Sequence, residues 1–305
     1  MQKLKIITIV FSIILAGCIV SAGFFDFLGG ITGRATSQPT NVSVAVAGTT
    51  QCQVVYVSQI SATNPIEASS TTITFNVHIY DQDGMNDINK SSVFANFTYD
   101  PNPNEYRTTV SNCTWVNNIP PRTANFSCSI DMWYWDGAGQ WNINVRGNDY
   151  GNKTPCYNTT TNFQYNQLKA MVISPDALTW PTVSSNADNQ TSNNDPTIIN
   201  NTGNYDGTID LTAIDLYGET NPSEYIPANN FTVGLTTGAE NPECLGTILS
   251  NGTAATITGS NANRGNLSAG GGAGQEEFYY CIPKVPLVSS QVYSTLQGGS
   301  WIVSY

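Results

Sequence analysis

The chain has few charged residues, and most of them are acidic. Asp, Glu, Lys and Arg make up 11% of its 305 residues, with 22 acidic residues against 11 basic ones. A surface of this sign repels phosphate backbones, which argues against nucleic acid as a partner. The scarcity of Glu, Lys and Arg also argues against surface helices, which favour these residues.

Histidine is nearly absent, and this limits the chemistry open to the chain. His78 is the only one, so a Ser-His-Asp or Cys-His mechanism would have to use it, yet no nucleophile motif accompanies it. Glu276 and Glu277 are adjacent acids, but neighbouring strand residues point to opposite faces and cannot converge on one bond. We therefore expect no enzymatic activity, and a secreted hydrolase that uses other acids is the least favoured alternative.

No Cys-x2-Cys motif occurs, which argues against a zinc site. Six cysteines follow the N-terminal apolar run, namely Cys52, Cys113, Cys128, Cys156, Cys244 and Cys281. An even number predicts three disulfides. Pro120-Pro121 lies midway between Cys113 and Cys128, so a hairpin that turns there sets these two opposite each other. Cys52–Cys156 and Cys244–Cys281 then follow as the pairs that stay within one domain each.

An export signal opens the chain at residues 1–22. Two lysines precede an apolar run from Ile6 to Ala22, and Val20-Ser21-Ala22 offers a small-residue cleavage site. Leu15-Ala16-Gly17-Cys18 also fits a lipobox, in which Cys18 would be lipidated. A third interpretation keeps the run as a membrane anchor with the N-terminus inside. All three predict an extracellular or cell-surface location for the rest of the chain, with membrane contact only through this N-terminal segment. Residues 23–45 contain Gly, Thr and Ser without a clear period, which predicts a linker or stalk.

Twelve Asn-x-Ser/Thr sequons predict N-glycosylation. They start at Asn41, Asn89, Asn96, Asn112, Asn125, Asn152, Asn158, Asn189, Asn200, Asn230, Asn251 and Asn266. Their excess over chance is modest in a chain this rich in Asn and Thr. Asn96 and Asn125 fall on the outward positions of alternating segments, where a strand can carry a glycan.

Apolar residues alternate with polar ones after residue 45, which is typical of strands. The clearest runs place Ile73, Phe75, Val77 and Ile79, then Trp141, Ile143 and Val145, then Phe231, Val233 and Leu235 on one face. Gly, Pro, Asn and Asp separate the runs, which predicts an all-β sandwich.

Three aromatic residues in succession allow two interpretations. We expect Trp133 and Trp135 to face the core and Tyr134 to face outward. In the alternative, exposed aromatics form a platform on which a sugar can stack.

A weak internal repeat divides the chain. Asp81-x-x-Gly84 and Asn96-Phe97-Thr98 recur at equal spacing as Asp215-x-x-Gly218 and Asn230-Phe231-Thr232, and Gly139-Gln140-Trp141 is similar to Gly299-Ser300-Trp301. We therefore expect two related domains, at 46–167 and 168–305. If the repeat alignment is right, the second domain lacks its last strand, so that either the chain is a fragment or the second sheet keeps an open edge. An open edge can be paired by a strand from another copy of the chain, which would be a self-association. Alternatively, Trp301–Tyr305 is itself the final strand.

Together these features resemble a known group of proteins. The run Asp81–Asp87, the Cys113/Cys128 hairpin, and Gly139–Val145 followed by Asn148-Asp149-Tyr150-Gly151-Asn152 resemble immunoglobulin-like repeats of archaeal-type secreted and cell-surface proteins. The resemblance covers most of 46–167 and is looser over 168–305. It implies two immunoglobulin-like β-sandwich domains in an S-layer-like or adhesin-like protein, with other surface proteins or glycans as partners.

The sharpest candidate site is Asp81, Asp83, Asn86 and Asp87. Alternate oxygen-bearing side chains around Gly84 can converge on Ca2+, the hard cation that such ligands suit. The pattern departs from an EF-hand because Ser92 stands where a bidentate Glu is required, and Asp149 could join from a neighbouring loop. The alternative is an ordinary turn with Asx hydrogen bonds and no cofactor.

We therefore predict a non-enzymatic extracellular surface or envelope protein with a structural or adhesive role. The alternative is a tethered carbohydrate- or protein-binding module.

Overall fold

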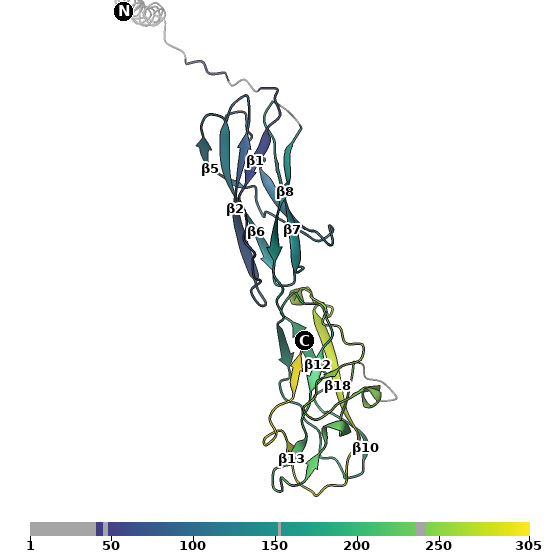
Figure 1. Cartoon of the computed structure of the whole chain (residues 1–305). Helices are drawn as coiled ribbons and strands as arrows, with labels where there is room; N and C mark the ends of the chain where they lie inside the picture. The colour runs from purple at the N-terminus through teal and green to yellow at the C-terminus, as the bar shows by residue number, and fades with distance from the viewer. Residues whose placement is uncertain (1–40, 45–47, 152–153, 236–241) are drawn as a thin grey trace, which may run out of the picture. The chain divides into compact units, whose positions relative to one another are not determined.

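The chain is almost entirely β-structure. The computed structural model describes residues 41–44, 48–151, 154–235 and 242–305 (Figure 1). The chain forms two units, Met1–Val46 and Ala47–Tyr305. Strands and three short 3-10 helices make up the regular structure of the described residues, so the predicted all-β fold is confirmed. No helix among the described residues has the length and apolar character needed to cross a bilayer. The predicted signal and Cys18, with most of the stalk, lie outside the described residues.

The N-terminal β-region (48–167) consists of two four-stranded antiparallel sheets. The first has the order β1 (Gln53–Val57), β2 (Ser70–Tyr80), β6 (Thr123–Trp133) and β5 (Thr114–Ile119); the second has β4 (Tyr106–Thr108), β3 (Phe94–Tyr99), β7 (Gly139–Gly147) and β8 (Cys156–Tyr165). Phe75, Phe97, Phe126 and Trp141 are almost completely buried in their shared core. The apolar faces predicted on β2 and β7 are confirmed, because their members are all buried.

The hairpin of β5 and β6 has the predicted register. Trp115 lies opposite Phe126, and the chain turns between Ile119 and Thr123, around the two prolines. One bulge near Val116 shifts the register in the strand that leads to the turn. On its other edge β6 forms an unbroken ladder with β2, from Ser70 opposite Trp133 to Tyr80 opposite Thr123.

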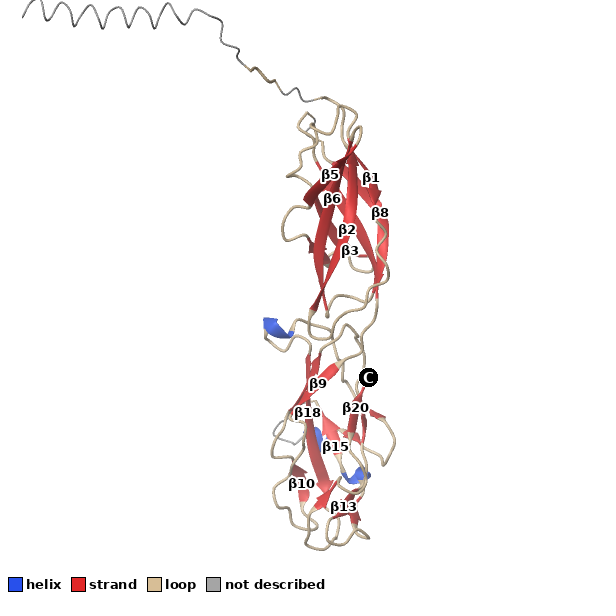
Figure 2. Cartoon of the chain, turned by 90° about the vertical axis from the view of Figure 1, so that its left-hand side faces the viewer, coloured by secondary structure: helices blue, strands red, loops and turns tan. Residues whose placement is uncertain are grey.

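The C-terminal β-region (168–305) has shorter strands (Figure 2). Its largest sheet has the order β16 (Thr247–Ile248), β15 (Thr232–Gly234), β18 (Gln275–Lys284), β11 (Thr197–Asn201) and β9 (Met171–Ser174), and β10 (Asp188–Thr191) also pairs with β18. Two three-stranded sheets have the orders β17 (Ala255–Thr256), β12 (Asp210–Thr212), β20 (Ile302–Ser304) and β14 (Tyr225–Ile226), β13 (Leu216–Gly218), β19 (Tyr293–Ser294). The 3-10 helices are η1 (Ala228–Asn230), η2 (Pro242–Leu245) and η3 (Leu267–Ala269). Phe231, Phe278 and Tyr280 lie in a separate buried cluster.

One predicted polar face in this region is wrong. The alternation that puts Phe231, Val233 and Leu235 on one face predicts that Thr232 lies on the opposite, solvent face, but only 3% of its surface is exposed. Helix η2 packs against β15 and is joined by its disulfide to Cys281, the residue opposite Thr232. The strand is therefore covered on both faces.

The strand pairings of the two β-regions do not follow the internal repeat. β3 pairs with β7, so that Phe97 lies opposite Ile143, whereas β15 pairs with β16 and β18 and the strand after Trp301 pairs with β12. The two buried clusters do lie on either side of the expected boundary after residue 167. The division into two related domains stays a prediction, because Ala47–Tyr305 is one compact unit.

Candidate functional site

The acidic loop begins directly after β2. The Asp83 backbone N–H donates to Asp81 Oδ1 (2.7 Å), and the Asp87 backbone N–H donates to the Gly84 carbonyl (3.0 Å). Gly84 has a φ of 122°, a conformation that L side chains rarely adopt. This reversal returns the chain so that Asp87 lies beside Asp81.

Three carboxylates converge in this loop. Asp81, Asp83 and Asp87 each offer an oxygen, and these three oxygens lie within 4.8 Å of one another. Asp81 is 0% exposed and Asp87 6%, while Asp83 is at the surface. The predicted gathering of these acids is therefore present, whereas the identity of a bound ion stays a prediction. Asn86 lies in the same turn with an exposed side chain.

Two of the buried oxygens have no hydrogen-bond partner. They are Asp81 Oδ2 and Asp87 Oδ1. Buried polar atoms are nearly always paired, and an unpaired carboxylate oxygen is costlier than a neutral one. These atoms therefore require a ligand or a water molecule.

Carboxylate oxygens in the cluster, and one from the neighbouring Asp149, accept hydrogen bonds from the backbone of the segment Gly48–Cys52. The Gly48 N–H donates to Asp87 Oδ2 (2.9 Å), and the Thr50 N–H donates to Asp83 Oδ2 (2.8 Å). The Cys52 N–H donates to Asp149 Oδ2 (2.9 Å). Every second amide of the segment thus binds a different carboxylate. Sequence reasoning missed these donors, because backbone amides have no residue signature.

The electrostatics of the loop are unfavourable to so many negative charges. Burial raises the pKa of Asp81 above its ordinary value, and the charges of Asp87, Asp149 and Asp83 raise it further. The hydrogen bond from the Asp83 amide opposes this rise. None of the ion pairs found among the described residues involves Asp81, Asp83 or Asp87.

The structure joins the three cysteine pairs that the sequence predicts. Cys52–Cys156 links the start of β1 to the start of β8 and thereby ties the two N-terminal sheets together. Cys113–Cys128 closes the β5–β6 hairpin, and Cys244–Cys281 joins η2 to β18.

The predicted sequons are accessible to different degrees. Asn152 lies outside the described residues, and none of the other eleven sequon asparagines is buried. Asn41, Asn112, Asn189 and Asn251 are exposed, and the remainder are half-buried. Glycan attachment stays a prediction.

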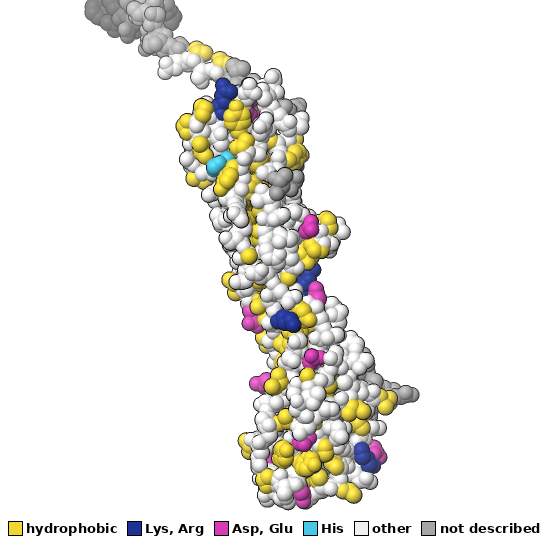
Figure 3. All heavy atoms as spheres, in the orientation of Figure 1, with side chains coloured by type: hydrophobic (Ala, Val, Ile, Leu, Met, Phe, Trp, Pro, Cys, Tyr) yellow, Lys and Arg dark blue, Asp and Glu magenta, His cyan; other side chains and the backbone are white. Residues whose placement is uncertain are grey.

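His78 and the two adjacent glutamates lie on different strands, β2 and β18, and make separate contacts. The His78 side chain is half-buried and reaches the face that Figure 3 shows. Its ring lies against that of Tyr56, with 4.6 Å between ring centroids, and burial lowers its pKa. The Glu276 carboxylate accepts the Asn261 N–H, whereas that of Glu277 accepts the Tyr279 hydroxyl. These two carboxylates are bound to separate partners.

The predicted orientation of the aromatic triplet is wrong. Tyr134 is buried, with 4% of its surface exposed, whereas Trp133 is 38% exposed and stacks on Trp135 with ring centroids 4.8 Å apart. The pleat of β6 explains the reversal, because its even-numbered residues from Ala124 to Met132 all face the core. The alternation through Phe126 and Ile130 already carried this signal.

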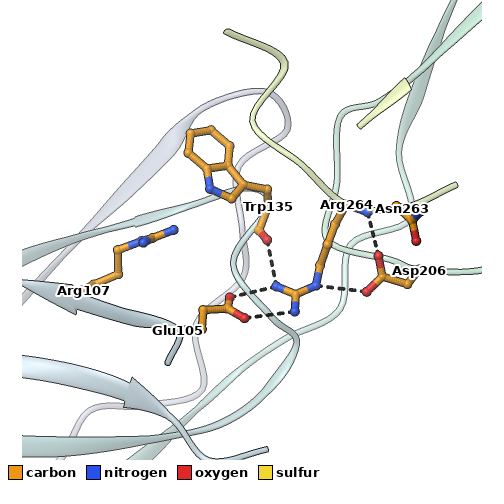
Figure 4. Close-up of a pocket in the computed structure, with 6 residues that line it drawn as sticks. All are labelled: Glu105, Arg107, Trp135, Asp206, Asn263 and Arg264. Atoms are coloured by element: carbon orange, nitrogen blue, oxygen red, sulfur yellow. Dashed lines mark hydrogen bonds and ion pairs between the residues drawn. The ribbon is translucent and has the colours of Figure 1, made fainter. Parts of the chain in front are cut away.

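An open hollow of about 400 Å3 lies beside Trp135 (Figure 4). Its lining is Glu105, Arg107, Trp135, Asp206, Asn263 and Arg264. The Arg264 guanidinium donates to both oxygens of Glu105 (2.8 and 3.0 Å), to Asp206 (3.0 Å) and to the Trp135 carbonyl (3.0 Å). Arg107 is paired with buried Asp136. Sequence reasoning did not identify this site, because its acids and arginines come from distant segments.

The sequence matches no known family model and no curated protein. The contacts described above therefore carry the functional argument.

Proposed function

We propose that the chain is a non-enzymatic extracellular surface or envelope protein with a structural or adhesive role. The observation that carries this proposal is the set of three disulfides in an all-β chain. Disulfides of this kind persist in oxidising environments outside the cytoplasm. The predicted signal at residues 1–22 and the accessible sequons support the same location.

A structural role also needs rigidity, and the disulfides supply part of it. The Cys52–Cys156 bridge closes a loop of 104 residues and joins two sheets that share one core. Cross-links that close long loops restrict the unfolded chain most, by up to about 5 kcal/mol in the chain-entropy model. This cross-link therefore stabilises the fold, although the described residues form few ion pairs.

Polar contacts link the N-terminal and C-terminal β-regions. Besides the Arg264–Glu105 pair, the Asn204 side-chain amide donates to the Asp136 carbonyl (3.0 Å) and the Thr202 hydroxyl donates to Glu67 (2.7 Å). The Leu267 N–H donates to the Tyr134 hydroxyl (3.2 Å). Contacts of this kind would let the described chain transmit load between its two β-regions, as a surface scaffold or adhesin must.

Intact-mass analysis and localisation of the native protein test this function together. We expect a surface-exposed chain with six oxidised cysteines and glycans on the exposed sequons. A cytoplasmic chain with free thiols would contradict the proposal.

A tethered carbohydrate-binding module is the second candidate, and the Trp133–Trp135 stack favours it. A sugar ring can stack on an exposed indole, and Asp206 and Asn263 beside the hollow offer hydrogen bonds to hydroxyls. Glycan-array binding that Trp133→Ala abolishes would support this candidate. Trp133 stacks on Trp135, which lines the hollow. The control is Trp115→Ala, because Trp115 is 41% exposed but lies on β5 and is not part of this stack. Equal binding by both variants and the unaltered chain would contradict it.

A further inference from the structure

The acidic loop has two sets of oxygens that do different things. Asp87 uses Oδ2 to accept the Gly48 amide, while its Oδ1 is buried and unpartnered. Asp81 uses Oδ1 to accept the Asp83 amide, while its Oδ2 is buried and unpartnered. Each of these buried acids is thus oriented by one oxygen, and its other oxygen is left for a ligand.

The spacing of the oxygens identifies the class of ligand. Two oxygens bound to one ion cannot be farther apart than twice the metal–oxygen bond, which is about 4.6–5.2 Å for Ca2+ and about 4.2 Å for Mg2+. The separations within 4.8 Å fall inside the calcium limit. All the groups offered are oxygens, and the nearby sulfur of Cys52 is held in a disulfide, which argues against zinc.

We propose that Asp81, Asp83 and Asp87 bind Ca2+ and that the ion clasps the segment Gly48–Cys52 to the N-terminal β-region. The ion neutralises charges that otherwise repel one another and fixes the carboxylates in place. The Oδ2 atoms of Asp87, Asp83 and Asp149 then hold the alternate amides of Gly48, Thr50 and Cys52. The clasp lies where the chain enters its first strand, next to the Cys52–Cys156 bridge.

The inference depends on the proposed function in one respect. Calcium sites of extracellular modules have dissociation constants of about 10⁻⁴–10⁻³ M, so a weak site is occupied only where the calcium concentration is that high. The proposed extracellular location supplies this condition. The binding experiment reads the ion alone, so its failure leaves the localisation experiment untouched. An intracellular location would likewise leave the binding result valid.

Calorimetric titration of the full chain, with its disulfides formed, tests the site. We expect saturable Ca2+ binding below about 10 mM, a rise in Tm on binding, and much weaker binding of Mg2+. Asp83→Asn should weaken Ca2+ binding at least tenfold, because it removes one charge but keeps an oxygen for the Thr50 amide. Asp81→Asn tests a buried ligand in the same way. Asp100→Asn is the control, since Asp100 is exposed at the end of β3 and should leave binding unchanged.

Hydrogen exchange over residues 48–52 tests the clasp itself. Ca2+ should slow exchange there in the unaltered chain and in Asp100→Asn, but not in Asp83→Asn. A plain Asx turn predicts no effect of Ca2+ on either Tm or exchange, and that result would overturn the site. Binding that leaves exchange at 48–52 unchanged would overturn the clasp, and equal binding by all variants would show adventitious ions.

Discussion

The two β-regions reach stability by different routes. In the N-terminal region, β2 and β6 are eleven residues long each and form one continuous ladder over a core of large aromatic side chains. In the C-terminal region most strands have two to five residues, and β18 alone reaches ten among those described. A long ladder is stabilised by regular backbone hydrogen bonds along its whole length. Short strands form few such bonds, so the loops between them need side-chain hydrogen bonds to hold them in place.

Side-chain hydrogen bonds do that work in the C-terminal region. Glu224 accepts from the Ser289 backbone N–H, from Gln291 (3.2 Å) and from the Tyr293 hydroxyl (2.9 Å), and thereby ties the start of β14 to the segment 289–293. These bonds lower the pKa of Glu224, the Ser289 hydroxyl most of all. Asn201 similarly bridges to the carbonyls of Tyr205 and Ala262. Continuous backbone ladders thus stabilise one β-region of the chain, whereas side-chain hydrogen bonds to loops stabilise the other.

The disulfides give the sharpest test of this difference. Replacing both cysteines of a pair by Ala should destabilise the chain in the order of loop length, by about 4.8 kcal/mol for Cys52–Cys156, about 3.8 for Cys244–Cys281 and about 3 for Cys113–Cys128. Denaturant unfolding of the three double variants measures the order. If the Cys244–Cys281 pair costs most, the short-strand region depends on its cross-link more than the entropy model allows.

Core truncation tests whether the two regions unfold together. Phe97→Ala and Phe278→Ala each remove a fully buried ring, and each should cost about 3–5 kcal/mol. If each region unfolds as a separate unit, calorimetry will show two transitions, and each variant will lower only one. A single transition lowered equally by both variants would contradict the prediction of two domains.

The sequence predicted the N-terminal region better for a physical reason. Alternation over β2 and β7 is long enough to identify a buried face, whereas β14, β16, β17 and β19 have two residues each and show no period. The acids of Asp81–Asp87 are close in sequence, so their convergence could be predicted. Their amide donors could not, because the folded path of Gly48–Cys52 decides which backbone groups meet them. The Arg264–Glu105 pair depends likewise on contacts between distant segments.

The Arg264 contacts link the two regions and come next in expected effect. Arg264→Ala should cost about 1–3 kcal/mol, because it leaves the Glu105 carboxylate, only 16% exposed, without its cationic partner. Arg264→Lys should recover part of the loss, since an ammonium cannot bind both oxygens with the same geometry. The control is Lys284→Ala, which removes an exposed pair with Asp188 and should cost less than about 1 kcal/mol. Thermal unfolding compares the three variants, and equal losses for Arg264→Ala and Lys284→Ala would show that the Arg264 pair adds nothing special.

The smallest expected effect is a pH dependence of the Tm that arises in the N-terminal region alone. His78 is the only histidine in the chain, and burial lowers its pKa. The unfolded imidazole, with a pKa of about 6.5, then takes up a proton before the folded one does, so stability falls as the pH drops below about 6.5. We expect the Tm to fall slightly between about pH 7.5 and 5.5, and His78→Gln should reduce that slope because its side chain does not titrate. The change should appear in the transition that Phe97→Ala lowers, since only the N-terminal region contains a histidine. An identical slope in the unaltered chain and in His78→Gln would assign the pH dependence to the carboxylates instead.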